Sequence, residues 1–154
     1  MSNASVRRDI ESREDIDALL ADFYGRTFRD ELLGPVFVDI AQMDLSVHLP
    51  VIGDFWQTVL FHDGGYRRNT LAPHQRLHEK ADLTPGHFDQ WLTLWRATID
   101  DRHAGRLADL AKVQGARVAG SMCRRITGTD SPMLRAAVQR APRRAFQPPG
   151  HARL

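Results

Sequence analysis

The chain has 154 residues, a formal net charge of +2, 42% hydrophobic residues and 26% charged residues. These values predict one soluble globular domain with a sizeable core. They exclude a membrane span, since no apolar run is long enough, and the polar N-terminus MSNASVRRDIESRED does not resemble a signal peptide. The single cysteine, Cys123, cannot form an internal disulfide, so we expect packed, inert sulfur in a reducing cytoplasm.

Basic residues concentrate near the C-terminus, and this distribution does not indicate a nucleic-acid-binding face. The basic residues concerned are Arg135, Arg140, Arg143, Arg144 and Arg153. After Gly128 the composition turns to Pro, Arg and Gln, which predicts a weakly ordered tail with a short helix over Met133 to Arg140. The sequence therefore predicts a domain over residues 1–128 and a tail over 129–154.

The first predicted helix begins at a sequence that resembles a capping box, Ser12-Arg-Glu-Asp15. Its apolar positions follow helical spacing, at Ile16, Leu19, Leu20, Phe23 and Thr27. Gly34-Pro35 is expected to stop this helix. Phe37 and Ile40 then lie in a turn or short helix.

A second helix is predicted to begin near Asp44 or Ser46, with Pro50 in its first turn because proline is costly deeper in a helix. One stripe of this helix carries a histidine among apolar and aromatic residues, namely His48, Ile52, Phe55, Trp56 and Val59. Gly64-Gly65 is expected to end it. A short helix is then predicted through Leu71, His74, Leu77 and His78.

Two longer helices complete the predicted domain, and no alternating strand pattern of useful length occurs, so the fold class is all-α. Thr84-Pro85 is a start signal, with Thr as N-cap and Pro at the first helical position. The stripe that follows comprises Phe88, Trp91, Leu92, Trp95 and Ile99. A last helix is predicted from Arg106 to Ile126, where Gly115 and Gly120 permit close packing. Its inward residues are expected to be Leu107, Leu110, Ala111, Val118 and Met122.

The histidines at positions 74 and 78 share a helix face, a spacing that can bind zinc. The motif His74-Gln-Arg-Leu-His78 lacks the glutamate of a zinc protease, and no further ligand cluster is evident, so a zinc hydrolase is a poor fit. A haem needs only one imidazole on its iron and apolar side chains over its ring. The helix of His48 facing that of His74 and His78 therefore predicts a haem pocket.

Three residues are candidate hydrogen-bond donors to a ligand on the haem: Tyr24, His48 and Trp91. Each alone is commonly a core residue with a locally satisfied polar tip. Their joint occurrence on three predicted helices favours a ligand pocket. Of the other histidines, His87 is expected in the first turn of its helix at the surface or rim. Solvated positions are expected for His62, His103 and His151.

Four segments of the chain resemble group III of the truncated haemoglobin family. They are Asp22-Phe23-Tyr24, Leu33-Gly-Pro-Val-Phe37, His48-Leu-Pro-Val-Ile-Gly-Asp-Phe55-Trp56 and Phe88-Asp-Gln-Trp91-Leu-Thr-Leu-Trp95. The third is the most specific and is similar to the distal helix of that group. The resemblance covers roughly Asp15 to Ile126. It implies a truncated globin fold, a two-over-two helical sandwich around haem b.

The resemblance also implies roles for individual residues. Tyr24 and Trp91 would donate hydrogen bonds to the bound ligand, and His48 would line or gate the distal side. The haem or its ligand cavity would be packed by Phe37, Ile52, Phe55 and Phe88. The iron ligand is expected to be His78, because the family's histidine precedes the phenylalanine at the start of the next helix by about one short loop. His74 is the alternative ligand, and the other of the two would lie near a propionate.

The function expected from this resemblance is binding of oxygen, nitric oxide and carbon monoxide. Several donors would slow oxygen release, which favours nitric oxide dioxygenation or peroxide reduction over delivery; whether the chain is an enzyme stays open. Either reaction would need a separate reductase, because the chain has no flavin or nicotinamide motif. We expect a cytoplasmic monomer. Two alternatives are a haem-free helical binding or regulatory module that keeps the globin core, and a haem sensor that contacts a partner through its basic tail.

Overall fold

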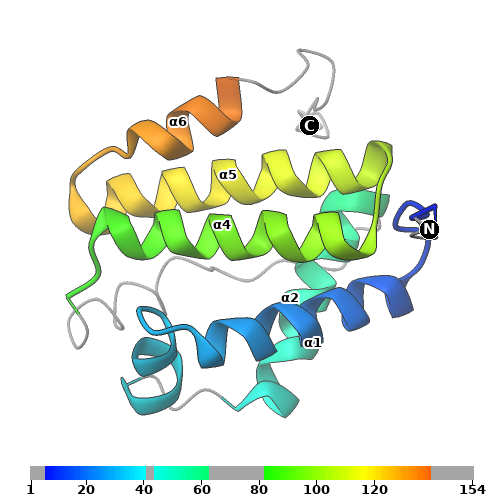
Figure 1. The fold of residues 1–154 in the computed structure, drawn as a ribbon, viewed down its shortest axis with the longest axis horizontal. Coiled ribbons are helices and arrows are strands. Elements are labelled where there is room, and N and C mark those ends of the chain that lie inside the picture. The colour runs from blue at the N-terminus through cyan, green and yellow to red at the C-terminus, as the bar shows by residue number, and fades with distance from the viewer. Residues whose placement is uncertain (1–5, 41–43, 63–81, 140–154) are drawn as a thin grey trace, which may run out of the picture.

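The computed structural model describes residues 6–40, 44–62 and 82–139, and every regular element within these ranges is a helix (Figure 1). The predicted all-α fold class is therefore confirmed. The elements are α1 (Arg13–Arg29), the π-helix η1 (Pro35–Ile40), α2 (Leu45–Phe61), α4 (Pro85–Arg102), α5 (Arg106–Thr127) and α6 (Pro132–Gln139). No helix in the described part of the chain is long and apolar enough to cross a membrane.

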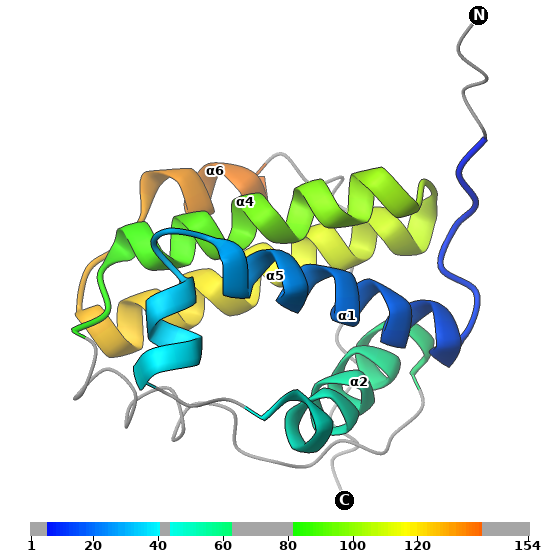
Figure 2. The same cartoon turned by 60° about the horizontal axis from the view of Figure 1, so that its bottom comes forward.

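The helices form two packed pairs, α1 with α2 and α4 with α5, and α1 also packs on α4 (Figures 1 and 2). The core lies between these pairs. Its largest fully buried side chains include Phe23, Ile16, Leu19, Leu20, Leu92, Trp95 and Ile99. Burial of these apolar stripes is the main stabilising contribution to such a bundle. This arrangement of two helices over two places the side chains of α1, α2 and α4 around one centre.

The predicted start signals of α1 and α4 are confirmed. The Ser12 hydroxyl accepts a hydrogen bond from the backbone N–H of Asp15 at 3.2 Å. At α4, Thr84 is the N-cap and Pro85 the first helical residue. Nδ1 of His87 accepts a hydrogen bond from the Thr84 N–H at 3.0 Å, so histidine takes the place that glutamate holds in the usual capping box. His87 thus lies in the first turn, as predicted.

Helix ends were predicted less well. α1 ends at Arg29, before Gly34-Pro35, because the Asp30 carboxylate accepts hydrogen bonds from the N–H groups of Leu32 and Leu33 at 3.1 and 2.9 Å. This local bonding competes with helix continuation. α2 begins after Asp44, as expected, but it ends at Phe61.

Two details of α2 also differ from the prediction. Its C-cap is His62, in the left-handed conformation at φ 57°, rather than the glycine pair at 64 and 65, which lies outside the described residues. Pro50 is the sixth residue of the helix, so it lies in the second turn rather than the first. A proline there donates no hydrogen bond to the turn before it, which weakens the helix locally.

The last long helix was predicted almost to its bounds, with Arg106 as its first residue and Thr127 as its last. Leu110 and Ala111 are buried as expected, whereas Leu107, Val118 and Met122 are half-buried. The burial of Ala108, Ala116 and Ala119 shows that small residues form much of its inner face. Small side chains allow α4 and α5 to approach closely along their length.

The expectation that His103 is solvated is wrong. This residue is 5% exposed at the corner between α4 and α5. Its Nδ1 lies 3.1 Å from the backbone oxygen of Arg8, and its Nε2 has no hydrogen-bond partner among the described residues. The partner is 95 positions away in the sequence. Local polarity therefore gave no sign of its burial.

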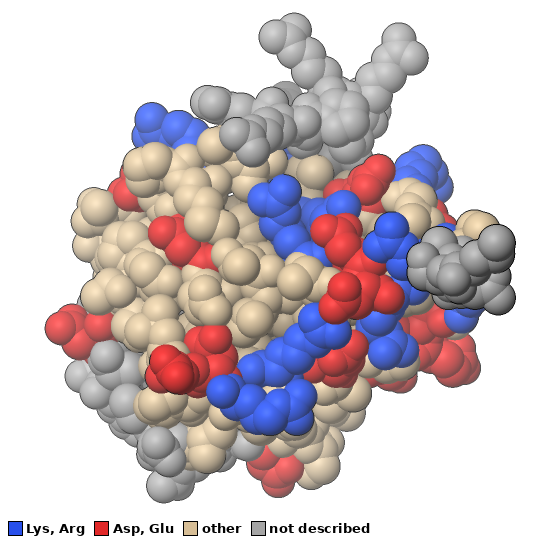
Figure 3. All heavy atoms as spheres, viewed as in Figure 1, with Lys and Arg blue, Asp and Glu red and all other residues tan. Residues whose placement is uncertain are grey.

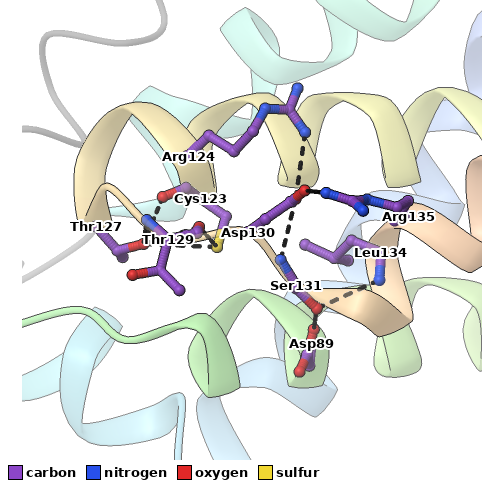
Figure 4. A network of polar contacts seen from close by, with 9 residues as sticks. All are labelled: Asp89, Cys123, Arg124, Thr127, Thr129, Asp130, Ser131, Leu134 and Arg135. Carbon is purple, nitrogen blue, oxygen red and sulfur yellow. Dashed lines mark hydrogen bonds and ion pairs between the residues drawn. The ribbon is translucent and has the colours of Figure 1, made fainter.

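The short helix expected after Gly128 is present as α6, and it packs on α5 and α4 (Figure 1). Leu134 is 1% exposed and belongs to the main core cluster. Figure 4 shows how the turn before α6 is fastened. The Ser131 hydroxyl donates to the Asp89 carboxylate of α4 at 2.5 Å, and Sγ of Cys123 lies 3.3 Å from the Thr129 backbone oxygen. The boundary at residue 128 stays a prediction, and residues 140–154 lie outside the described part.

Cys123 is buried, as expected of a packed sulfur. Its burial raises the pKa of the thiol, so the reactive thiolate is disfavoured. On the face of the molecule shown in Figure 3, basic and acidic side chains are interspersed. Ion pairs such as Arg26–Asp101 and Lys112–Asp100, both at 2.8 Å, join helices across the surface. Because the two signs of charge are mixed, this face is not uniformly basic.

The residues before α1 are tied to the rest of the fold by two carboxylates. Asp9 accepts hydrogen bonds from the N–H groups of Leu107 and Ala108 at 2.9 and 2.8 Å, so it caps α5 from a distant segment. Asp15 is 8% exposed and accepts two hydrogen bonds from the Arg8 guanidinium, at 2.7 and 2.5 Å. These bonds lower the pKa of Asp15 to about 2.

We therefore expect Asp15→Asn to lower the free energy of unfolding at pH 7 by about 1–2 kcal/mol. This value is smaller than the pKa shift alone would give, because Arg8 is exposed and solvent screens its attraction to Asp15. A carboxyl whose folded pKa is depressed stabilises the fold above its unfolded pKa. This contribution is lost as the pH falls from about 4 to about 2. Urea unfolding at pH 7 and pH 2 would measure it. Glu14→Gln, in the same first turn but exposed, should change stability little; an equal loss in both variants would contradict the assignment.

Candidate functional site

Tyr24 stands on the inner face of α1 and is 7% exposed. Its ring meets three others edge-on, with centroid distances of 5.0 Å to Phe23, 6.5 Å to Phe28 and 6.2 Å to Phe37. No residue in the described ranges makes a hydrogen bond with its hydroxyl. Burial raises the pKa of the Tyr24 phenol well above its usual range, so the group stays a neutral O–H donor.

Trp91 of α4 lies beside the same cluster and is half-buried. Its ring meets Phe23 edge-on at 5.4 Å and stacks on Trp95 at 5.9 Å with an interplanar angle of 18°. The indole N–H of Trp95 donates to the Ala111 backbone oxygen at 3.0 Å. No such bond is present for Trp91 within the described residues. The structure therefore brings Tyr24 and Trp91 together around Phe23, each with a donor that those residues do not use.

A close approach of α5 makes room for this aromatic stack. A Cβ atom at Gly115 would lie 2.5 Å from Cδ1 of Trp95 and 3.6 Å from Cζ3 of Trp91. Only a glycine fits here without moving the indole, as its predicted packing role requires. On its other side Trp95 stacks on Trp56 of α2 at 4.7 Å. The stack holds Trp91 in a fixed orientation relative to α1 and α2.

The predicted pocket residues of α2 share one face of that helix. His48, Ile52 and Phe55 are spaced by four and three residues, which places them on neighbouring turns of that face. Ile52 and Phe55 are half-buried, and Phe55 meets Trp56 edge-on at 5.2 Å. His48 lies on the same face of α2 as Ile52 and Phe55, as expected. Its side chain is nevertheless exposed rather than covered by apolar neighbours. Its role toward a ligand stays a prediction.

Two further predicted residues lie on η1 and α4. Phe37 is half-buried on η1 and faces Tyr24, whereas Phe88 is 8% exposed in the first turn of α4. Several apolar side chains around this centre are only partly buried. They include Phe28, Ile52, Phe55, Val59, Trp91 and Leu94. Together with Phe37 of η1, these partly exposed apolar side chains of α1, α2 and α4 provide a surface that an apolar ring would cover.

Both candidate iron ligands, His74 and His78, lie outside the described residues. Their assignment stays a prediction. Over residues 6–40, 44–62 and 82–139, no three His, Cys, Asp or Glu residues gather in a way that could hold a metal ion. Burial lowers the pKa of His87, whose Nδ1 is engaged in capping α4. His87 therefore has a structural role there.

Arg13 was not predicted to take part in the site. It reaches from the first turn of α1 onto α2, where its Nη2 donates a hydrogen bond to the backbone oxygen of Pro50 at 3.1 Å. The only sign of it in the sequence was Gly53, an isolated glycine inside a helical pattern. Such a glycine usually marks close packing or function. A Cβ at Gly53 would lie 2.6 Å from Nη2 of Arg13.

Comparison with known proteins supports the predicted resemblance. No model of a known protein family matches the chain. It is 28% identical over 95 residues to the group 3 truncated hemoglobin ctb of Campylobacter jejuni, a match that covers 58% of this chain and 70% of that protein. The crystal structure of group III truncated hemoglobin from Campylobacter jejuni matches with a TM-score of 0.68 and 22% identity, and covers 79% of this chain and 95% of that one. The structural match establishes the globin fold, and the sequence match confirms the resemblance to group III.

Proposed function

We propose that this chain, which has the truncated globin fold and resembles a group III truncated haemoglobin, binds haem b and through it oxygen and other small diatomic ligands. One observation carries the proposal. The Tyr24 side chain is 7% exposed, its ring and that of Trp91 both meet Phe23 edge-on, and neither donor is used by a described residue. A hydrogen bond from a largely buried donor to a partly charged acceptor contributes about 1–3 kcal/mol. A bound ligand that accepts a hydrogen bond from the Tyr24 hydroxyl would therefore be held more tightly.

The side chains present fit a haem. The ring is flat and largely apolar, so it needs apolar and aromatic cover together with one imidazole for its iron. Phe37, Ile52, Phe55 and Phe88 would supply part of the cover. His78 would ligate the iron, with His74 as the alternative. When bound, the haem supplies reversible binding of diatomic ligands at its iron.

The chain's own residues would then control how long a ligand stays. A neutral phenol and an indole N–H both donate, and both lie in an apolar setting where a hydrogen bond is stronger than in water. They would stabilise negative charge that develops on a bound oxygen molecule and slow its release. Slow release is poorly suited to delivery, so the pocket favours chemistry on the bound ligand.

Two reactions suit such a pocket: oxygenation of nitric oxide to nitrate, and reduction of peroxide. For peroxide, the His48 imidazole would carry a proton between the two oxygens while Tyr24 and Trp91 polarise the bond between them. Both reactions need electrons from a separate reductase. A cytoplasmic monomer served by such a reductase remains our prediction from the sequence.

Product analysis separates these reactions from simple storage. The reduced, haem-loaded protein equilibrated with air would be mixed with nitric oxide in equal amount, and nitrate and nitrite would be measured. We expect nearly stoichiometric nitrate, formed faster than oxygen dissociates. Nitrite as the main product, at the rate seen in buffer alone, would contradict a nitric oxide dioxygenase. Peroxide consumption with a chemical reductant would then test the second reaction.

A further inference from the structure

The first half of α2 has no buried side chain. Residues 45–52 are all exposed or half-buried, and the buried residues of α2 are Gly53, Trp56 and Leu60 in its middle and second half. Pro50 lies within this first half and donates no hydrogen bond to the preceding turn. Apolar packing therefore fixes the second half of α2 more firmly than the half that carries His48.

Arg13 of α1 bonds α2 where its two halves meet, at one backbone oxygen of the first half and at two side chains of the second half. Its Nη2 donates to the backbone oxygen of Pro50 at 3.1 Å, and its Nη1 donates to Oδ1 of Asp54 at 2.8 Å and Oε1 of Gln57 at 2.7 Å. Its Nε donates to Oδ1 of Asp17 at 2.8 Å, which orients the guanidinium from its own helix. The three acceptors on α2 are spaced by four and three residues, so they lie along one face.

Gly53 lets the guanidinium lie directly on the backbone of α2. A Cβ at this position would come within 2.6 Å of Nη2 and 2.9 Å of Cζ of Arg13. A glycine in the interior of a helix costs about 1 kcal/mol relative to alanine. At position 53 the glycine leaves room for the Arg13 guanidinium, which the side chain of an alanine would displace.

We propose that Arg13 is a positioning residue for the ligand pocket. It fastens the middle of α2, from the Pro50 oxygen to Gln57, to α1, the helix that carries Tyr24. His48 and Ile52, two residues to either side of Pro50, are thereby fixed relative to the Tyr24 hydroxyl. The proposal rests on the proposed function, because the pocket it positions is the one that would hold the haem. Arg13 itself would touch neither haem nor ligand.

If Arg13 only stabilised the fold through its ion pairs, its loss would have the same effect as the loss of another ion-paired arginine of α1. Arg26 is the matched control for this comparison. Arg13 and Arg26 lie on the same helix, and each side chain is 28% exposed. Arg26 pairs with Asp22 at 2.9 Å and Asp101 at 2.8 Å, so it joins α1 to α4 rather than to α2. Exposed ion pairs contribute little to stability, so both alanine variants should unfold at similar temperatures.

The first readout is hydrogen exchange of the backbone amides of residues 45–49, 51 and 52 in the full-length chain. Arg13→Ala is expected to speed this exchange about tenfold, the factor that corresponds to loss of one hydrogen bond from a charged donor. Arg26→Ala should leave it unchanged. Equal exchange in the two variants would overturn the proposal.

Gly53→Ala sharpens this test. In the Arg13→Ala background the alanine only raises helix propensity, so it should slow exchange. With Arg13 present it also displaces the guanidinium, and the slowing should be lost. The same effect of Gly53→Ala in both backgrounds would show that the guanidinium is not seated on α2, and would overturn the proposal.

The second readout is carbon monoxide binding to the haem-loaded protein after flash photolysis. Arg13→Ala should change the binding rate several-fold, and Arg26→Ala should not. Altered exchange with unaltered carbon monoxide kinetics would overturn the positioning role. Hydrogen exchange needs no haem, so a chain that fails to bind haem would refute the proposed function while the exchange comparison still decides whether Arg13 holds α2.

Discussion

Tyr24→Phe should release oxygen faster by roughly one to two orders of magnitude. The substitution removes one hydroxyl and nothing else, and a largely buried donor to a partly charged acceptor contributes about 1–3 kcal/mol. Because no described residue bonds this hydroxyl, the variant should be as stable as the parent chain or slightly more stable. Stopped-flow measurement of oxygen dissociation, beside thermal unfolding, would give both quantities.

The control for this substitution is a donor that the fold already uses. The indole N–H of Trp95 is bonded to the Ala111 oxygen at 3.0 Å, so it cannot serve a ligand. Trp95→Phe should therefore lower stability and change oxygen dissociation less than Trp91→Phe, which removes a donor to the ligand. An unchanged rate in Tyr24→Phe would remove Tyr24 from the site.

His78→Ala should abolish the spectrum of a histidine-ligated haem, because the iron would lose its protein ligand. Imidazole added to the solution should restore much of that spectrum if the rest of the pocket is intact. His74→Ala should keep the spectrum, with at most weaker haem retention. Absorption spectra of the reduced variants, with and without imidazole, would measure these effects.

The opposite pattern, loss in His74→Ala and retention in His78→Ala, would move the iron ligand to His74. His87→Ala is the control, since that imidazole is used in capping α4 and lies outside the predicted ligand pair. Its haem spectrum should be that of the parent chain. Retention of the spectrum in both the His74 and His78 variants would contradict a proximal histidine in this segment.

The parts of the fold that local chemistry decides were predicted well from the sequence. Ser12 and Thr84-Pro85 mark helix starts because capping involves residues only three positions apart. The end of α1 was placed too late. Asp30 stops the helix through its own side chain and also accepts a hydrogen bond from the Gln90 amide of α4 at 2.7 Å.

The site was predicted in its residue types more than in its geometry. Tyr24 and Trp91 could be chosen from the motifs, and the structure brings both to Phe23. The exposure of His48 could not be inferred, because a helical stripe gives the face of a side chain but not how closely other elements cover it. The contact of Arg13 with α2 was also missed, since it joins residues up to 44 positions apart.

The most direct test of the central claim is an absorption titration of the purified chain with haem, recorded in the ferric, ferrous and carbon-monoxide-bound forms. We expect saturation at one haem per chain, with a sharp Soret band that shifts on reduction and again on addition of carbon monoxide. A folded chain that gives no stoichiometric Soret band would keep the globin fold and contradict the haem-dependent function proposed for it.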